Sequence, residues 1–325
     1  MSKLIAVTGA TGFAGRHVIA ALLAEGYRVQ ALVRNPAMAR LTDDVVLVQG
    51  DLATPDALEL LVEGADAVIH LAGAITANSA PEYFRVNAQG TLALAESAQR
   101  AGVRRFVHVS SLSAREPAIS DYGASKREGE DAVASLMEAL NAIILRPPAV
   151  YGPGDRATLP LLKELTRPVA AIPGRREARF SLILVADLAR LIAKAVESDL
   201  TGRHEVSDQT PGGYGWPDLL RVASAVRGSA IRPVFLPRAI PQAVALAAES
   251  VAKIRRKPGM INRGKIAELY HPDWVSGPSG LTLPQPITFE QGFPETLDWY
   301  RQAGWLPQSA GADRSSGETK HRTRS

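Results

Sequence analysis

The sequence predicts an α/β protein in which a doubly wound parallel sheet precedes a smaller C-terminal lobe. Short apolar runs alternate with segments of helical length and helical apolar spacing through the first half of the chain, as in consecutive βαβ units. The first run, residues 4–7, leads into a turn with three regularly spaced glycines, which is typical of nucleotide-binding sheets. The alternation stops beyond Gly154. We expect a nucleotide-binding domain over residues 1–153, to which strands of the second half can return, a substrate-binding lobe over 154–305 and a disordered tail over 306–325.

Composition excludes several kinds of site. The 325 residues are 46% hydrophobic and 22% charged, as in an ordinary globular protein, and the formal net charge is +4. There is no cysteine, which excludes disulfides, thiolate catalysis and cysteine metal sites, and we expect no metal centre. No run of eighteen apolar residues predicts a membrane-spanning helix, and no basic leader precedes the first strand. We therefore expect a cytoplasmic protein.

The glycine-spaced turn predicts a phosphate cradle. Gly9 permits the tight turn, Gly12 lets the backbone approach a pyrophosphate, and Gly15 lets the next helix pack close to the strand, with its N-terminal amides facing the anion. The residues expected to line this cradle are Gly9, Thr11, Gly12, Phe13 and Gly15. An ordinary turn with close helix packing is the alternative.

A helical apolar stripe that ends near Gly26 separates the cradle from a second strand, residues 29–33, which ends in Arg34. At this position an acidic residue binds the 2′-hydroxyl of NAD, whereas a guanidinium pairs with the 2′-phosphate of NADP. Neither Val33 nor Asn35 supplies a competing acid. The sequence therefore favours NADP(H) over NAD(H), with a solvated surface arginine as the alternative.

Three further strands follow, and each ends in small or polar residues. We expect them over residues 45–48, 67–71 and 106–109, with helices over 55–62 and 81–101. The carboxyl ends of parallel strands line the ligand crevice of such a sheet, so the residues after each strand are candidates for the site. These candidates are Gly50, Asp51, Leu52, Ala72, Gly73, Ser110, Ser111 and Ser113.

Tyr122 and Lys126 open the next predicted helix and, four positions apart, share one of its faces. A phenol with an ordinary pKa of ~10 is a poor acid–base group at neutral pH, and a neighbouring ammonium stabilises its anion. The pair can exchange a proton with a substrate oxygen that a hydroxyl of the serine cluster holds. Next to the cradle, this predicts carbonyl or alcohol chemistry, although a tyrosine and a lysine at this spacing are commonly structural.

In these motifs and their order the chain resembles the extended short-chain dehydrogenase/reductase family, whose members have a Rossmann-type fold. The matching segments are residues 8–15, 50–52, 70–73, 87–91, 110–111, 122–126 and 146–153. The resemblance implies that Tyr122 donates or accepts the proton, that Lys126 also holds the nicotinamide ribose, and that Ser111 orients the substrate oxygen. Ser110 and Ser113 stay open as substitutes, because the connection from Ser111 to Tyr122 is shorter than in many members.

The resemblance also implies contacts with the rest of the cofactor. Asp51 and Leu52 would contact the adenine, and the segment over residues 147–151, with Pro148 and Val150, would close over the nicotinamide end. The residues that would line the cofactor after the fourth strand are Leu71, Ala72 and Gly73.

One position departs from the branch that acts on nucleotide sugars. Those members usually carry an asparagine just before the Val-Tyr-Gly motif, where this chain has Ala149. The chain is closer in character to lipid-acting ketoreductases, the branch with 3β-hydroxysteroid dehydrogenases and the reductases of bacterial ceramide synthesis. The resemblance therefore disfavours an epimerase or dehydratase.

The segment over residues 235–265 is the most informative part of the second half. It contains a mostly apolar helix between Pro237 and Pro258, and six basic residues without an acidic one follow from Ser250 onward. The basic residues are Lys253, Arg255, Arg256, Lys257, Arg263 and Lys265. Such a helix suits an anionic membrane surface, and a core helix whose basic end complements its dipole is an equal alternative. Nucleic-acid binding is disfavoured because no aromatic residues are interleaved with the basic ones.

The sequence thus predicts an NADP-dependent oxidoreductase that transfers hydride between nicotinamide and a ketone or secondary alcohol of a lipid-like substrate, such as a 3-oxo ceramide or sphingoid intermediate. A nucleotide-sugar epimerase or dehydratase is one alternative. A non-catalytic, NADPH-binding subunit of the respiratory complex I accessory type is another. We expect a small apolar substrate, no nucleic acid, and peripheral contact with the inner face of a membrane; the oligomeric state is left open.

Overall fold

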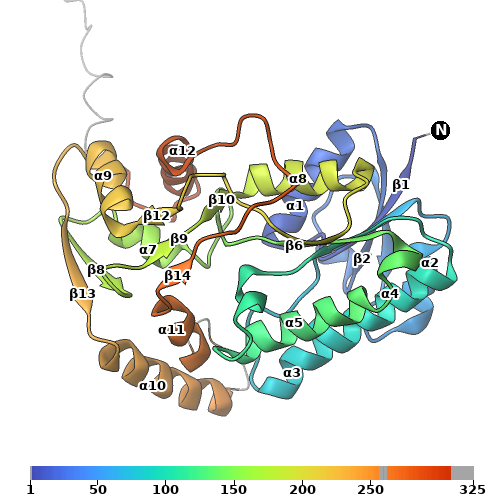
Figure 1. Ribbon diagram of the computed structural model, residues 1–325, viewed down its shortest axis with the longest axis horizontal. Helices are drawn as coiled ribbons and strands as arrows, with labels where there is room; N and C mark the ends of the chain where they lie inside the picture. Colours follow the sequence, from blue (N-terminus) through green and yellow to red (C-terminus); the bar gives the residue numbers. More distant parts are fainter. Residues whose placement is uncertain (1, 256–258, 260–261, 309–325) are drawn as a thin grey trace, which may run out of the picture.

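The structure is a computed structural model that describes residues 2–255, 259 and 262–308 of the chain. Figure 1 shows a main sheet flanked by helices on the right and a smaller lobe on the left. The strands are β1 (Leu4–Thr8), β2 (Arg28–Val33), β3 (Val45–Gln49), β4 (Ala67–His70), β5 (Phe106–Val109), β6 (Ala142–Arg146), β7 (Ala149–Tyr151), β8 (Val169–Pro173), β9 (Arg179–Phe180), β10 (Leu182–Leu184), β11 (Gly202–Glu205), β12 (Tyr214–Gly215), β13 (Arg232–Leu236) and β14 (Asp273–Trp274).

The helices lie between these strands and cover them. The α-helices are α1 (Phe13–Ala24), α2 (Pro55–Val62), α3 (Ala80–Phe84), α4 (Gly90–Arg100), α5 (Asp121–Ala134), α6 (Met137–Leu140), α7 (Leu159–Glu164), α8 (Val185–Glu197), α9 (Trp216–Arg227), α10 (Ala239–Arg255), α11 (Arg263–Leu269) and α12 (Phe289–Gln302). Short helices of other types are the 3-10 helices η1 (Pro36–Met38) and η3 (Leu112–Arg115) and the π-helix η2 (Arg85–Gln89).

The main sheet has seven parallel strands in the order β3-β2-β1-β4-β5-β6-β11. The chain runs outward from β1 to β3 and then returns to the other side of β1, so the direction of winding reverses between β1 and β4. A ligand crevice forms at such a reversal, outside the carboxyl ends of the strands. The predicted doubly wound parallel fold is confirmed, and β2 to β5 begin and end within one residue of the predicted strands.

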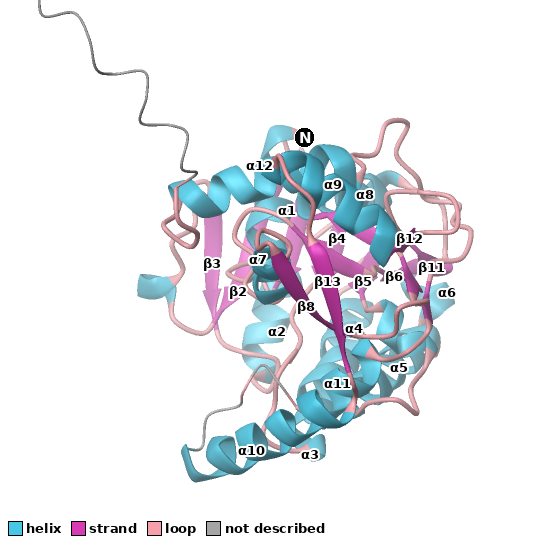
Figure 2. Cartoon of the chain, turned by 90° about the vertical axis from the view of Figure 1, so that its left-hand side faces the viewer, coloured by secondary structure: helices cyan, strands magenta, loops and turns pink. Residues whose placement is uncertain are grey.

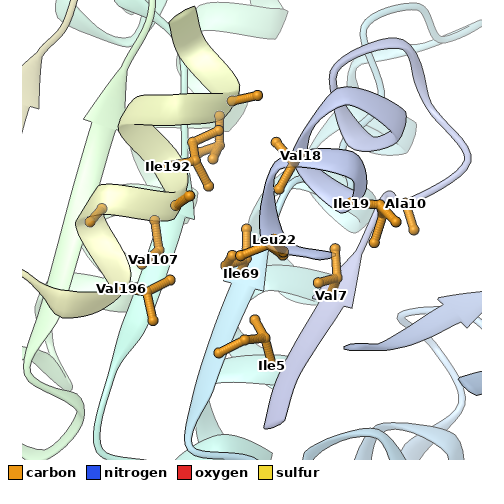
Figure 3. Close-up of a cluster of buried hydrophobic side chains, with 14 of the residues drawn as sticks. Ile5, Val7, Ala10, Val18, Ile19, Leu22, Ile69, Val107, Ile192 and Val196 are labelled. Atoms are coloured by element: carbon orange, nitrogen blue, oxygen red, sulfur yellow. The ribbon is translucent and has the colours of Figure 1, made fainter. Parts of the chain in front are cut away.

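Each face of the main sheet carries its own helices and core. On one face α1 and α8 lie side by side, with Val18 and Leu22 of α1 facing Ile192 and Val196 of α8 over the strands (Figure 3). On the other face α2, α4 and α5 contribute to a second apolar cluster. Because α8 and β11 come from the second half of the chain, residues beyond Gly154 complete the main sheet and one of its helix layers.

The helix expected over residues 81–101 is built from three consecutive pieces. α3 is followed by the π-helix η2 and then by α4. A π-helix has a wider turn and often marks a functional site. Here it places Asn87 in the interior, where its side chain is fully buried.

The smaller lobe has its own core. A two-stranded sheet of β8 and β13 (Figure 2) and a three-stranded sheet of β9, β12 and β14 (Figure 1) pack with α7, α9 and α12. Trp216, Phe289 and Phe293 fill this core, and Leu306, where the tail was expected to begin, is also buried in it. Residues 309–325, most of the expected tail, lie outside the described residues.

The apolar helix expected within residues 235–265 is α10, and its apolar side chains are not all buried. Ile240 is 51% exposed and Val244 is 54% exposed, so a core role is wrong for these two residues. The side chains of Lys253 and Arg255, and all of Arg256 and Lys257, fall outside the described part of the chain. None of the helices in that described part has the length and apolar character needed to cross a bilayer.

Candidate active site

The turn after β1 has the geometry of a phosphate cradle. Gly9 has a φ of +76°, and a Cβ atom at this position would lie 2.6 Å from the backbone nitrogen of Ala72. A Cβ atom on Gly15 would lie 2.1 Å from the carbonyl oxygen of Gly9, so only glycine lets α1 begin this close to the strand. Thr11 and Gly12 are exposed at the mouth of the turn.

The N-terminus of α1 is open to an anion. Within the described residues no side chain caps it, and its first turn carries no acidic residue. The free backbone amides of a helix N-terminus attract a negative charge. The cradle and the helix end therefore fit the diphosphate of a dinucleotide.

Arg34 and Asp51 follow β2 and β3 at the same edge of the sheet. Arg34 is exposed, and its guanidinium makes no hydrogen bond or ion pair with another described residue. Asp51 holds its own loop, because its Oδ1 accepts hydrogen bonds from the backbone nitrogen of Ala53 at 2.9 Å and from Thr54 Oγ1 at 3.1 Å. Both residues lie where a dinucleotide fold binds the adenosine, and their roles stay predictions.

The helix α5 presents Tyr122 and Lys126 to the carboxyl end of β5. Ser120 caps its N-terminus, since Ser120 Oγ accepts a 2.9 Å hydrogen bond from the backbone nitrogen of Gly123. One turn later, Lys126 Nζ donates a 3.0 Å hydrogen bond to the carbonyl oxygen of Val109, the last residue of β5. Tyr122 and Lys126 therefore lie on one helix face at the end of this strand, as their spacing predicted.

The end of β4 also reaches this space. A Cβ atom on Gly73 would lie 3.8 Å from Lys126 Nζ, and Leu71 and Ala72 precede Gly73 beside the cradle. The residues predicted to line the cofactor are thus brought between the cradle and the Tyr122–Lys126 pair.

The two adjacent serines after β5 have different surroundings. Ser110 Oγ donates a 2.7 Å hydrogen bond to Glu130 Oε1, and Glu130 is fully buried in an ion pair with Arg146. Ser111 instead has its hydroxyl close enough to Tyr122 to lower the pKa of the phenol, while its Oγ accepts a 3.2 Å hydrogen bond from the backbone nitrogen of Ser113. Of the three serines, Ser111 is the one whose hydroxyl adjoins the phenol.

Burial changes the acidity of both catalytic candidates. It raises the pKa of Tyr122 to about 12; the nearby hydroxyl of Ser111 lowers this pKa, and the charge of Glu268 raises it. Burial lowers the pKa of Lys126 to about 8, partly offset by the carboxylate of Glu130. Because the ammonium of Lys126 is directed at the carbonyl of Val109, its stabilisation of the Tyr122 phenolate stays a prediction.

The structure assigns Asn87 a position that the sequence analysis did not recognise. Its Oδ1 accepts a 2.7 Å hydrogen bond from the backbone nitrogen of Ala74, and its Nδ2 donates to Ala74 O and to Ser125 Oγ, both at 3.0 Å. Asn87 therefore ties the segment after β4 to the helix α5 beside Lys126. Asn87 begins the 87–91 segment that carries the family resemblance, but the resemblance assigned it no role.

Residues of α3 and of the segment around α11, which the sequence did not single out, lie beside Tyr122 and the start of α5. The ring of Tyr83 in α3 packs edge-on against the ring of Tyr122, with centroids 6.1 Å apart. Glu268 of α11 is buried and accepts a 2.6 Å hydrogen bond from Ser120 Oγ. Asn262, at the start of α11, donates a 3.4 Å hydrogen bond to the hydroxyl of Tyr83.

The segment over residues 147–153 connects the serine end of the site to the cradle. The backbone nitrogen of Leu112 donates a 2.8 Å hydrogen bond to Pro147 O, and a ring nitrogen of His17 in α1 lies 3.0 Å from Pro153 O. Pro148 and Val150 lie within this segment and are partly buried. Their contact with a nicotinamide stays a prediction.

Comparison with known proteins shows the family to which the chain belongs. Residues 5–206 match the model of the NAD dependent epimerase/dehydratase family. Ceramide reductase of Caulobacter vibrioides (strain NA1000 / CB15N) is 40% identical over 310 residues, which cover 94% of this chain and 97% of that protein. A 3 beta-hydroxysteroid dehydrogenase/Delta 5→4-isomerase of Mycobacterium tuberculosis (strain CDC 1551 / Oshkosh) is 28% identical over 240 residues, 65% of this chain and 63% of its own.

Solved structures show the same fold at low identity. The UDP-glucose 4-epimerase of Thermus thermophilus, in complex with NAD, superposes with a TM-score of 0.67 at 21% identity and covers 92% of this chain and 99% of its own. At this identity the likeness concerns the fold alone.

Proposed function

Because the chain belongs to the NAD dependent epimerase/dehydratase family, among the extended short-chain dehydrogenases/reductases, and is an NAD(P)-dependent oxidoreductase, we propose that it transfers hydride between NADPH and a ketone of a long-chain, lipid-like substrate. The observation that carries this proposal is the meeting of Ser111, Tyr122 and Lys126 at the carboxyl end of β5. Similarity to a ceramide reductase over nearly the whole chain supports a 3-oxo ceramide or sphingoid substrate.

The chain's own groups perform the proton chemistry of the reduction. A bound nicotinamide supplies the hydride. Ser111 donates a hydrogen bond to the carbonyl oxygen, and Tyr122 passes its phenolic proton to that oxygen as negative charge develops there. Because the pKa of Tyr122 is raised to about 12, the phenol is protonated at neutral pH, which is the form that a reduction needs. Lys126 would hold the nicotinamide ribose.

Two further features support the details of the proposal. The guanidinium of Arg34 is exposed beyond β2, where it can pair with the 2′-phosphate of NADPH. Ala149 is exposed where members that act on nucleotide sugars usually have an asparagine, so the chain lacks that amide for a sugar diphosphate. Both features favour NADPH with a substrate that carries no nucleotide.

The proposal is tested by mixing the purified protein with NADPH and following absorbance at the reduced nicotinamide band. We expect oxidation when a 3-oxo ceramide is added, and none with UDP-glucose. Tyr122→Phe should abolish turnover and leave NADPH affinity unchanged. Tyr27→Phe is the matched control, because the hydroxyl of Tyr27 contacts Glu197, a side chain outside the site.

Three results would contradict the proposal. Unchanged turnover in Tyr122→Phe would refute the role of the phenol. Epimerisation of a UDP-sugar without ketone reduction would favour the nucleotide-sugar alternative. Bound NADPH that is never oxidised by any long-chain ketone would favour the non-catalytic subunit.

A further inference from the structure

The helix α10 presents an uncharged, apolar face to solvent. Ile240, Ala243, Val244 and Ala247 are all exposed, and their spacing of three and four residues places them on one side of the helix. Ile240 is 51% exposed and Val244 is 54% exposed. The chain carries no charged residue from Ala239 to Ala248. In a soluble domain the exposed side of a helix is usually its charged side, whereas this exposed face of α10 is apolar and uncharged.

The opposite side of α10 holds the helix on the protein. Ala245 is fully buried and packs in a small apolar cluster with Ile266 and Tyr270, next to Leu269. At the end of this contact, Glu249 accepts hydrogen bonds from the backbone nitrogen and the Nε of Arg263. The outward direction of Ile240 and Val244 is therefore set by the packing of α10 on α11.

The exposed face lies within the most basic part of the sequence. Residues 238–265 contain seven basic residues and one acidic residue, a formal charge of +6, whereas the whole chain carries only +4. The rest of the chain is thus slightly acidic. Among the described side chains, Arg263 is 68% exposed and Lys265 is 54% exposed, although each is paired with a glutamate. A partner for this face must accept apolar side chains and positive charge together.

We propose that the exposed face of α10 docks on an anionic phospholipid surface. Ile240 and Val244 enter the boundary between headgroups and acyl chains, and the net positive charge of the segment favours an anionic surface over a neutral one. A second copy of this chain would bring another +6 segment to the same place, and its repulsion disfavours a self-interface. A membrane is the partner that matches both the apolar face and the charge.

The position of α10 suits this role. Figures 1 and 2 both place α10 at the periphery of the molecule. It packs on α11, whose Glu268, with Asn262 at the N-cap, lies beside the Tyr83–Tyr122 pair. If the substrate is lipid-like, as the proposed function states, docking through α10 brings the substrate side of the site near the bilayer. Docking itself needs no substrate and no turnover.

The test is co-flotation of the full chain with vesicles in the absence of substrate. Vesicles of phosphatidylcholine with phosphatidylglycerol should carry the protein upward at low salt, and vesicles of phosphatidylcholine alone should carry much less. Binding to the anionic vesicles should weaken as salt is raised, because salt screens the headgroup attraction. The double variant Ile240→Glu/Val244→Glu should weaken binding to the anionic vesicles by roughly tenfold or more.

A matched double variant controls for added negative charge. Val46 is 61% exposed on β3 and Leu60 is 56% exposed on α2, so Val46→Glu/Leu60→Glu makes the same change of charge away from α10 and should keep vesicle binding. Equal losses in the two double variants, or no flotation of the wild type, would overturn the proposal. A wild-type dimer that Ile240→Glu/Val244→Glu converts to a monomer, without vesicle binding, would assign the face to a second copy. Ketone reduction of a short-chain, soluble substrate is measured in parallel, so a failure of docking and a failure of the proposed function are distinguished.

Discussion

Ser110 and Glu130 form a buried hydrogen bond in which Ser110 Oγ donates to Oε1 at 2.7 Å. Glu130 also accepts from Arg146 Nε at 2.8 Å and from Arg146 Nη2 at 2.6 Å, so the serine belongs to a buried, charged cluster between α5 and β6. The neighbouring Ser111 faces Tyr122 instead. The contact with Glu130 gives Ser110 a structural role and leaves Ser111 as the serine that can hydrogen-bond to a substrate.

We therefore expect opposite effects from the two serine variants. Ser111→Ala should lower kcat/KM for the ketone by roughly 10²–10³-fold, as for loss of a hydrogen bond to a developing oxyanion, with little change in melting temperature. Ser110→Ala should keep most of the activity and lower the free energy of unfolding by about 1–3 kcal/mol, because a buried carboxylate loses a donor. Steady-state kinetics and thermal unfolding check both, and a larger kinetic loss in Ser110→Ala would reverse the assignment.

The lowered pKa of Lys126 predicts pH-dependent cofactor binding. Burial lowers this pKa to about 8, so the ammonium becomes a neutral amine as the pH rises through that value. If Lys126 holds the nicotinamide ribose, the affinity of the free protein for NADPH should fall above about pH 8. Lys126→Met should bind more weakly at neutral pH and show no such fall. Fluorescence titration across neutral and mildly alkaline pH measures both, and parallel profiles for the two proteins would contradict the role of Lys126.

Arg34 predicts a preference between the two nicotinamide dinucleotides. Its exposed guanidinium should pair with the 2′-phosphate, which NADPH carries and NADH lacks. Arg34→Ala should raise the Kd for NADPH by roughly tenfold or more, as for loss of a charged hydrogen-bonded pair, and leave the Kd for NADH almost unchanged. Arg28→Ala, at the exposed start of β2, is the control. An equal loss for both cofactors would refute the prediction.

His108 predicts a pH-dependent change in stability. It is fully buried in β5, its ring stacks on His70 with centroids 5.2 Å apart, and neither of its ring nitrogens has a hydrogen-bond partner among the described residues. Burial, together with the charges of Lys126 and His70, lowers its pKa well below the usual value of 6.5. Below about pH 6.5 the unfolded chain therefore binds a proton that the native His108 does not, and the wild type loses stability as the pH falls.

His108→Phe keeps the aromatic stacking and removes the two unpaired nitrogens. It should raise the free energy of unfolding by about 1–3 kcal/mol at about pH 8, and by more at about pH 5. Denaturant unfolding at the two pH values measures the difference. Overpacking by the larger Phe ring would change the free energy of unfolding equally at the two pH values. A stabilisation that does not increase as the pH falls would therefore contradict the prediction.

The sequence alone determined the local features of this protein. The apolar runs of β2 to β5, the left-handed turn at Gly9, the close start of α1 at Gly15, and the four-residue spacing of Tyr122 and Lys126 each depend on backbone geometry over a few residues. Strand and helix periods, left-handed φ values and side-chain positions one helical turn apart are all properties of neighbouring residues. They can therefore be predicted without knowing the tertiary contacts.

The tertiary structure decided which of these local candidates meet. In the sequence only the family resemblance favours Ser111 over Ser110, whereas in the structure the buried contact of Ser110 with the Glu130–Arg146 pair separates the two serines. Glu268 reaches the helix of Tyr122 from a distant part of the chain, and α10 exposes its apolar side because Ala245 packs on α11. Such relationships depend on which surfaces pack together, and a short stretch of sequence does not determine which distant residues will pack against it.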